Sequence, residues 1–188
     1  MKELLSLLNN IHPVTPLLQQ YLFRTVQQHQ FSKKDFLLKA GEISHRVYFI
    51  KRGLLRAYYL ENGQEICSKF MKEGDLIVSV ISFFKQKPGY EYIQAIEDCE
   101  VYSLRYDELQ YMYKNFRELN IIARVLISKY YVLSEQRLYF LRKKKAAERY
   151  YMMVRYFPRI MLRVPDKYIA SFLGISKETI SRIRSGKY

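Results

Sequence analysis

The 188-residue chain has few of the residues that cross-link proteins or bind metals. It contains two cysteines and three histidines, and it has no tryptophan. Two cysteines exclude a disulfide framework and a cysteine-rich metal cluster, because both need more of them. The sequence shows no Ser-His-Asp or Cys-His arrangement and no glycine-rich phosphate loop. We therefore expect no catalytic residues, no metal and no cofactor.

Long apolar runs are also absent. No stretch approaches the roughly 18 uninterrupted apolar residues that a membrane helix needs. The apolar segment at residues 4–8 is too short for a secretory signal. Hydrophobic residues nevertheless make up 49% of the chain, which is ample for a packed core. A cytoplasmic protein without a membrane partner is expected, with Cys67 and Cys99 as small buried residues on strands.

The charge is unevenly distributed. The net charge is +14. Residues 1–136 carry 18 Lys and Arg against 15 Asp and Glu, whereas residues 137–188 carry 14 against 3. A positive charge concentrated in the last quarter of a chain speeds its encounter with polyanions. This favours a nucleic acid as partner, although a solvated basic face or a membrane-surface patch would have the same composition.

The sequence pattern of residues 31–104 indicates a small β-barrel. Glycines at 41, 53, 63 and 74 separate short segments rich in aromatic and β-branched residues. Short strands at this spacing are typical of an antiparallel sandwich or barrel. Asn62-Gly63 predicts a type I′ hairpin, whose two central residues need positive φ. We expect strands at 47–50, 54–60, 65–71, 91–96 and 100–104, with short helices at 2–10 and 15–29 before them.

After Tyr106 the hydrophobic period becomes helical. A first helix fits 106–115, and a longer one runs from about Arg117 into the low 140s without Gly or Pro. Apolar residues recur along it at seven-residue intervals, which favours a homodimeric coiled-coil seam. The alternative is that this stripe packs on the barrel of its own chain. The predicted seam consists of Leu119, Ile122, Leu126, Leu133 and Phe140.

A basic run at 142–145 follows, and it either caps the helix or lies along a DNA backbone. An amphipathic helix comes next and ends at Pro158. These patterns predict three parts. Residues 1–115 form a β-barrel sensor domain with short N-terminal helices, residues 116–143 form the dimerisation helix, and residues 144–188 form the DNA-binding domain. The fold class is α+β, with an N-terminal double-stranded β-helix, or jelly roll.

The most specific local pattern is a helix-turn-helix at residues 166–185. Ala170 supplies the small residue where the two helices cross, and Gly174 supplies the turn residue that tolerates positive φ. Ser176 is a good N-cap for the second helix, and Glu178 suits its first turn. Apolar residues stand where they would lock the two helices together: Ile169, Leu173, Ile175, Ile180 and Ile183.

The outward face of the second helix is polar, and its side chains are of the types that read base edges and phosphates. In this motif the N-terminal residues of the second helix enter the major groove. A helical hairpin that only completes a core is the alternative, but every requirement of the motif is met within one window. The predicted DNA-binding face contains Lys177, Glu178, Thr179, Ser181 and Arg182.

The order of barrel, long helix and this motif resembles the Crp/Fnr family of regulators over roughly residues 15–185. Residues 36–42 and 47–53 are similar to the opening of a cyclic-nucleotide-binding jelly roll, and residues 173–183 are the more specific marker. The resemblance implies an effector-sensing β-domain, a dimerising helix and a DNA-reading C-terminal domain. It also implies that Lys177, Glu178 and Arg182 read bases, while Ser176 and Thr179 contact the backbone.

The chain departs from that family in the effector pocket. Cyclic-nucleotide binders carry Gly-Glu and, about ten residues later, an Arg that neutralises the cyclic phosphate. Here Gly74-Asp75 is followed by Pro88-Gly89-Tyr90-Glu91, and residues 57–104 contain no arginine. A phosphate there would lack its charge-assisted partner, so cyclic AMP is not the expected effector. An iron–sulfur cluster needs about four cysteines. The effector therefore stays unknown, and nothing specific points to haem.

A second departure is that the sequence ends four residues after Arg184, where the family usually has a two-stranded wing. We therefore expect phosphate contacts from Lys167, Arg184 and Lys187. The expected partners are double-stranded DNA with a palindromic operator and a second copy of the chain. RNA polymerase is a further partner that such a role would allow.

Two other functions compete with this interpretation. One is a ligand-sensing or protein-interaction module whose degenerate DNA domain binds DNA only non-specifically. The other is a metal-dependent enzyme of the cupin type, which needs histidine and glutamate around its metal. His12 and His29 lie outside the predicted barrel, so His45, in a predicted turn, is its only histidine. This scarcity argues against the enzyme.

Overall fold

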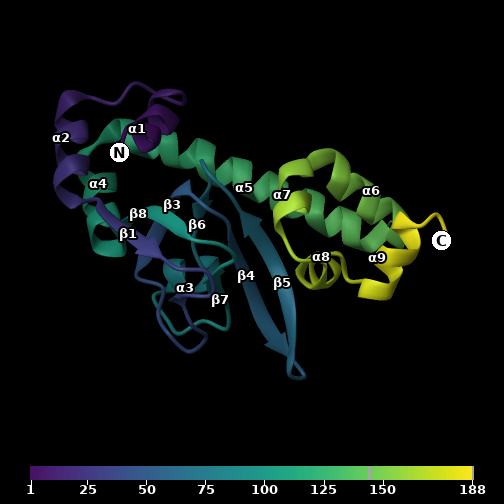
Figure 1. Ribbon diagram of the computed structural model, residues 1–188. Helices are drawn as coiled ribbons and strands as arrows, with labels where there is room; N and C mark the ends of the chain where they lie inside the picture. Colours follow the sequence, from purple (N-terminus) through teal and green to yellow (C-terminus); the bar gives the residue numbers. More distant parts are fainter. Residues whose placement is uncertain (144, 188) are drawn as a thin grey trace.

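The computed structural model describes residues 1–143 and 145–187, except for the side chains at positions 140 and 143. Two antiparallel four-stranded sheets form a roll, one long helix runs past it, and a group of C-terminal helices lies at the far end (Figure 1). The predicted α+β class, with a jelly roll and a helical C-terminal domain, is confirmed.

The first sheet, sheet A, has the strand order β1-β8-β3-β6, and the second, sheet B, has the order β2-β7-β4-β5. The hairpin turn between β4 and β5 has φ of 50° at Asn62 and 77° at Gly63, as the I′ signal predicts. The strands are β1 (Gln27–Phe31), β2 (Phe36–Leu38), β3 (Arg46–Arg52), β4 (Leu55–Glu61), β5 (Gln64–Met71), β6 (Leu76–Ile77), β7 (Tyr92–Ala95) and β8 (Cys99–Arg105).

Side chains alternate between the inner and outer faces of each sheet, as the two-residue period of a strand requires. In β3, Ile50 lies in the core between the sheets, whereas Phe49 packs outward under the N-terminal helices. In β4, Leu55 and Ala57 face inward and Tyr58 faces outward. Both sheets therefore need a helical cover. Cys67 and Cys99 are buried on their strands, as predicted.

Sheet A is covered by α1 (Lys2–Asn9), α2 (Pro16–Thr25), α4 (Tyr106–Asn115) and the first half of α5 (Arg117–Lys143). Thr15 caps α2, because its hydroxyl accepts a hydrogen bond from the Leu18 amide at 3.3 Å. Pro16 follows at the first helical position, where its missing N–H costs nothing. Leu18 and Leu22 then lie fully inside the core of this layer.

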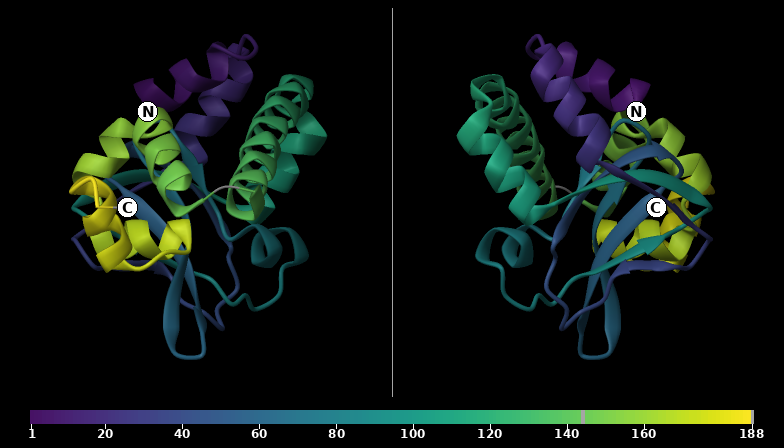
Figure 2. Two further views of the ribbon diagram at one scale, coloured as in Figure 1. Left: turned by 90° about the vertical axis from the view of Figure 1, so that its right-hand side faces the viewer. Right: turned by 90° about the vertical axis from the view of Figure 1, so that its left-hand side faces the viewer.

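Sheet B is covered by the C-terminal helices, which are α6 (Ala146–Tyr156), α7 (Pro158–Arg163), α8 (Asp166–Leu173) and α9 (Lys177–Arg184). The same apolar cluster contains Leu54, Tyr58 and Phe70 from the roll and Met153 and Ile169 from these helices. The molecule thus has helical layers outside both sheets, and Figure 2 shows α5 standing beside them (Figure 2).

The long helix α5 has two different faces. Leu119, Ile122 and Leu126 are buried against α1, α4 and sheet A of their own chain, so these three predicted seam residues are not available to a partner. The alternative interpretation, packing on the barrel, therefore holds for the first half of α5. Leu133 is exposed, and the Phe140 side chain lies outside the described residues.

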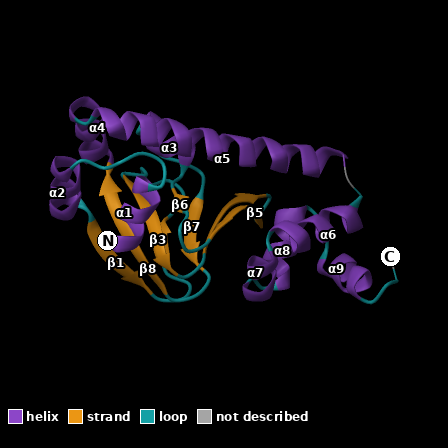
Figure 3. Ribbon diagram, turned by 90° about the horizontal axis from the view of Figure 1, so that it is seen from above, coloured by secondary structure: helices purple, strands orange, loops and turns teal. Residues whose placement is uncertain are grey.

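Leu126 is the last residue of α5 in the apolar core with sheet A. Farther along, the Tyr130 hydroxyl accepts from the Leu76 amide of the roll at 2.8 Å, and the end of the helix runs on past the roll (Figure 3). An open hollow of about 670 Å³ follows the inner side of α5. Most of its lining is apolar and comes from α5, the roll and the C-terminal helices. The space between the two sheets is instead filled by packed side chains such as Ile50, Leu55 and Ile93.

One local prediction was wrong, one was confirmed with an addition, and one short helix was missed. Residues 27–29 belong to β1 and not to a helix, so His29 lies in the roll, where its Nε2 pairs with the Ser103 hydroxyl at 2.8 Å. Pro158 closes α6 but also begins α7, because proline suits the first turn of a helix. The short helix α3 (Val80–Lys85) was missed, since six residues show too little periodicity.

None of the helices in the described ranges is long and apolar enough to cross a membrane. Within residues 1–143 and 145–187, His, Cys, Asp and Glu side chains form no group of three suited to a metal ion.

Gly53 lies where the backbone after β3 packs closely against residues 98 and 99. A Cβ atom at Gly53 would lie 2.5 Å from the Cys99 sulfur and 2.8 Å from the Asp98 carbonyl oxygen, whereas one at Gly41 would meet nothing within 4 Å. Both glycines have positive φ. We expect Gly41→Ala to cost about 1–2 kcal/mol of unfolding free energy and Gly53→Ala more than about 4 kcal/mol. Urea unfolding of both variants checks this, and equal losses would contradict it.

Candidate nucleic-acid interface

Helices α8 and α9 form the helix-turn-helix that the sequence predicts. Gly174 ends α8 in the left-handed region, with φ of 63° and ψ of 44°. The Ile175 amide donates to the Ala170 carbonyl at 3.0 Å and closes the turn. Ala170 is buried where the helices cross, and a larger side chain would push them apart. The turn chemistry of the sequence thus fixes the angle between the two helices.

A small apolar core locks the pair to the rest of the C-terminal helices. The side chains of this core come from both helices, are buried and pack with Tyr150 and Met153 of α6. Ile175, in the turn, is partly buried against them. The buried members are Ile169, Leu173, Ile180 and Ile183.

Ser176 caps α9 as predicted. Its hydroxyl oxygen accepts a hydrogen bond from the Thr179 amide at 3.1 Å, which satisfies one of the unpaired N–H groups at the helix start. Hydrogen bonds to its own backbone amide and to Ser176 lower the pKa of Glu178. The start of α9 therefore combines a fixed backbone with an ionised carboxylate.

The predicted recognition face is exposed. Lys177, Glu178, Ser181 and Arg182 lie on the outer side of α9, and Thr179 is half-buried beside the cap. Their neighbours Ile180 and Ile183 face the core. The helix thus presents one cationic and polar stripe outward while its other side is anchored.

The three expected phosphate contacts divide into two kinds. Lys167 and Lys187 are exposed. Arg184 is occupied: its guanidinium makes two hydrogen bonds to the Asp166 carboxylate, at 2.7 and 2.8 Å, and a third to the Tyr150 hydroxyl, at 2.8 Å. The hydrogen bonds to Asp166, and to a smaller extent the one to Tyr150, raise the pKa of Arg184. Its role in the structure is to tie the end of α9 to α8 and α6.

The helix-turn-helix docks on the roll through the outer edge of β5. The Ser171 hydroxyl accepts from the Cys67 amide at 2.9 Å and donates to the Glu65 carbonyl at 2.6 Å. Arg137 of α5 donates to the Cys67 carbonyl at 3.1 Å. Because β5 is an edge strand, these side chains satisfy main-chain groups that a further strand would otherwise take.

Arg56 is a second link between α8 and the roll. Its guanidinium lies 4.0 Å from the ring centre of Tyr58 and 3.7 Å from that of Tyr168. It also donates to Glu65 at 2.6 Å and to Gln94 at 2.6 Å. A buried arginine needs such partners, and two aromatic faces with two acceptors supply them.

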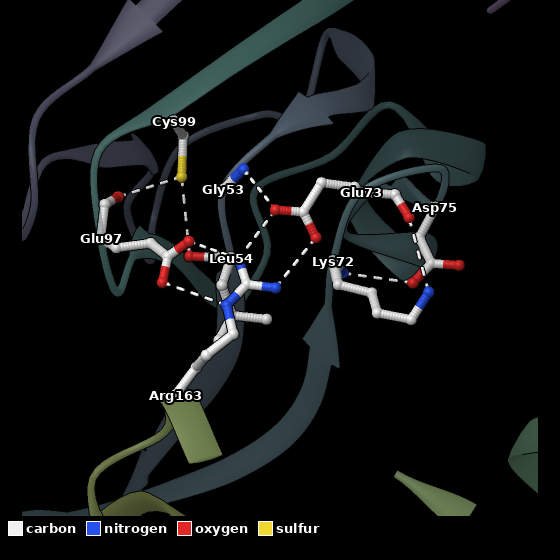
Figure 4. Close-up of polar contacts among 8 residues, drawn as sticks. All are labelled: Gly53, Leu54, Lys72, Glu73, Asp75, Glu97, Cys99 and Arg163. Carbon is white, nitrogen blue, oxygen red and sulfur yellow. Dashed lines mark hydrogen bonds and ion pairs between the residues drawn. The ribbon is translucent and has the colours of Figure 1, made fainter. Parts of the chain in front are cut away.

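Arg163 forms the third link (Figure 4). It comes from the end of α7 and reaches two carboxylates of the roll, Glu73 before β6 and Glu97 before β8. Its hydrogen bonds to the Glu73 carboxylate are 2.8 and 2.9 Å long, and Glu73 also accepts from the Gly53 amide. The Arg163 hydrogen bonds lower the pKa of Glu73 to about 2. Glu73 and Arg163 are therefore both charged at neutral pH.

These links escaped sequence reasoning. Ser171 and Glu65 are 106 residues apart, and Arg163 and Glu73 are 90 apart. One sequence contains no signal that pairs residues at such separations. The only hint was compositional, since Arg56 and Arg163 stand in apolar surroundings where a charged residue is rare.

Comparison with known proteins agrees with this architecture. Residues 28–116 match the model of the cyclic nucleotide-binding domain family. The anaerobic regulatory protein of Pasteurella multocida is 28% identical over 163 residues, a match that covers 80% of this chain and 59% of that protein. The fumarate and nitrate reduction regulatory protein of Vibrio cholerae is also 28% identical, with 64% of its length covered. The chain thus spans about three fifths of the length of the curated relatives it matches.

Solved structures share the whole arrangement. FixK2 of Bradyrhizobium japonicum superposes with a TM-score of 0.75 at 19% identity, covering 86% of this chain and 84% of that one. A regulator from Eubacterium rectale assigned to the Crp/Fnr family gives 0.74 at 16% identity, covering 94% and 87%. The chain is thus similar to Crp/Fnr-family regulators in sequence and in fold. The relatives named are regulators and none is an enzyme, in agreement with the expectation from the sequence.

A buried thiol reports on the third link, the Arg163 clasp. The Cys67 thiol is fully buried where α8 meets β5, so it reacts only when that contact opens. We expect Arg163→Gln to raise the labelling rate of Cys67 by a maleimide several-fold. Arg159→Gln, an exposed residue of the same helix, is the control and leaves the rate unchanged. Mass spectrometry of the labelled peptides separates Cys67 from Cys99, and equal rates in both variants would contradict the role of the clasp.

Proposed function

We propose that this chain is a homodimeric, sequence-specific DNA-binding transcription regulator of the Crp/Fnr type and not an enzyme. The observation that carries the proposal is the anchored and exposed recognition helix. Its apolar side is buried, its first turn is capped by Ser176, and Lys177, Glu178 and Arg182 lie outward. A helix held in this way can enter a major groove without losing its own packing.

The residues of α9 have separate roles in this proposal. Lys177 and Arg182 donate to guanine, and Glu178 accepts from cytosine, because these side chains match the edges of those bases. Ser176, Thr179 and Ser181 contact the sugar–phosphate backbone or nearby bases. Lys167 and Lys187 add phosphate contacts. Arg184 keeps the geometry of the motif through its hydrogen bonds to Asp166 and Tyr150, and it is not among the phosphate contacts of this proposal.

The partner chain would bind along the outer side of α5. A stripe of exposed apolar residues repeats there every seven residues, at Val125, Val132 and Tyr139, on a different side of α5 from the face that Leu119 and Ile122 bury in the roll. Such a stripe is the requirement for pairing with a second copy. Leu133 lies on the continuation of the buried face and lines the hollow beside α5, so its seam role stays a prediction from the sequence. Phe140 stays a prediction from the sequence, because its side chain is not described. Further exposed apolar residues lie on another side of α5, outside this stripe: Ile127, Tyr131 and Leu138.

Cyclic AMP is not the effector that we propose. Residues 57–104 hold no arginine that could pair with its phosphate, and the space between the sheets is packed. The proposed setting is the cytoplasm, with a palindromic operator and RNA polymerase as further partners of the dimer.

Selection of DNA from a random pool tests the proposal. A symmetric dimer predicts an enriched palindrome with half-sites about one helical turn apart. Arg182→Ala should cost about 1–3 kcal/mol of binding free energy and relax preference at one base pair of each half-site. Lys187→Ala, the matched control, should weaken binding to all sequences alike and reduce the salt slope by about 1. Failure to enrich any palindrome would favour a degenerate, non-specific DNA domain.

The dimer face has its own test. Val132→Asp places a charge in the proposed apolar stripe and should weaken self-association about tenfold or more, because an unpaired buried charge costs more than about 1.4 kcal/mol. Ser134→Asp adds the same charge on another side of α5 and should leave the equilibrium unchanged. Sedimentation equilibrium over a range of concentrations measures both. An unaltered dimer in Val132→Asp would place the interface elsewhere.

A further inference from the structure

Glu91 is a buried acid that neither the helix-turn-helix nor the dimer face uses. It stands between α3 and β7 and is 8% exposed. One carboxylate oxygen accepts from the Ser79 hydroxyl at 2.8 Å. The other accepts from the Ser68 hydroxyl at 3.2 Å and from the Lys69 ammonium at 3.4 Å. Three donors from two separate segments therefore converge on one carboxylate.

The donors are committed to this carboxylate. Ser79 is 2% exposed and stands at the N-cap position of α3, yet its side chain makes no capping bond and donates to Glu91 instead. Ser68 lies at the irregularity of β5, where the register between β4 and β5 shifts. The next residue, Lys69, pairs with Ala57, which faces the core between the sheets. The donors thus surround a point at the inner side of the roll.

The loop that carries Glu91 is fixed in place. The Gly89 amide donates to the Glu42 carbonyl at 3.1 Å, and the Gly41 amide donates to the Gly89 carbonyl at 2.8 Å. A Cβ at Gly89 would come within 2.8 Å of the Ser82 Cβ, so only glycine allows this close approach. Ser82 in turn donates to the Lys87 carbonyl at 2.6 Å. These contacts fix the backbone of the loop and hold the Glu91 carboxylate beside its donors.

We propose that Ser68, Lys69 and Ser79 form a small oxyanion site of the roll and that Glu91 fills it from within the chain. Two hydroxyls and an ammonium around one point are the donor set that a free carboxylate or phosphate would need. Glu91 belongs to the segment in which cyclic-nucleotide binders have the arginine that pairs with the phosphate. In this chain the segment supplies a carboxylate instead, and that carboxylate takes the place of the anion of a ligand. The roll then reaches its assembled state without an anionic effector.

The inference concerns the roll alone and does not depend on DNA binding. An external phosphate would meet the Glu91 carboxylate at the site, where like charges repel and the donors are already used. Removing the carboxylate should therefore convert an occupied site into an empty one with the same donors. Glu91→Ala deletes a fragment of the size of acetate, which makes acetate the matching probe.

Thermal unfolding of Glu91→Ala with added acetate tests the proposal at constant ionic strength, with chloride as the reference salt. We expect the variant to have a lower Tm than the wild type and acetate to restore at least half of the difference in a saturable manner. Glu100→Ala is the matched control, because Glu100 pairs with Lys51 and Arg52 at the margin of the roll, at 2.7 and 3.0 Å. Its Tm should not respond to acetate beyond the chloride reference.

Two results would overturn the proposal. One is a folded Glu91→Ala whose Tm acetate does not raise saturably. The other is a saturable rise in the Tm of the wild type with acetate as large as that of Glu91→Ala, which would mean that acetate acts at another place in the protein. If Glu91→Ala does not fold in chloride, refolding from urea in acetate decides, with recovery of native circular dichroism supporting the site and its absence rejecting it. Because none of these measurements uses DNA, they are independent of the proposed regulator function.

Discussion

The structure depends on one shared apolar core, in which the outer face of sheet B and the C-terminal helices bury each other. Tyr58 and Phe70 of the roll lie in the same cluster as Met153, Ile169 and Leu173 of the helices. The polar links are arranged around it, with Ser171 on the edge of β5 and Arg163 between two carboxylates. Apolar burial supplies the stabilisation in such an arrangement, and the charged links fix the orientation. The roll and the helix-turn-helix therefore form one continuous body within this chain.

The long helix shows why a heptad pattern is ambiguous. Apolar residues every seven positions mark a face that must be buried, but the pattern does not say against what. At about 1.5 Å per residue, the 27 residues of α5 extend about 40 Å. The roll covers Leu119, Ile122 and Leu126, and a different side of the helix carries Val125, Val132 and Tyr139. The sequence pattern found one face and missed the other, since the latter is interrupted by Ser128 and Glu135.

Local rules predicted the parts of the fold that local chemistry determines. Asn62-Gly63 identified the β4–β5 hairpin, the starts of α4 and α5 fell within a residue of their predicted positions, and Gly174 marked the turn of the reading motif. Interactions between distant segments could not be predicted. Arg184 looks like any exposed cation until Asp166 is placed beside it, and Glu91 looks like a loop acid until Ser79 faces it. Both depend on the closed fold.

The hydrogen bonds of Ser171 and Arg137 to the edge of β5 have a consequence for how the protein behaves when the C-terminal helices separate from the roll. With the C-terminal helices removed, the Cys67 amide and the Glu65 carbonyl would lie bare on the edge strand β5, which also carries Phe70 beside Tyr58 of β4 on the outer face of the sheet. Such an edge is a template for strand addition by another molecule. The helices that would read DNA thus also act as a guard against aggregation. The docking surface would then protect solubility as well as hold the helix-turn-helix in place.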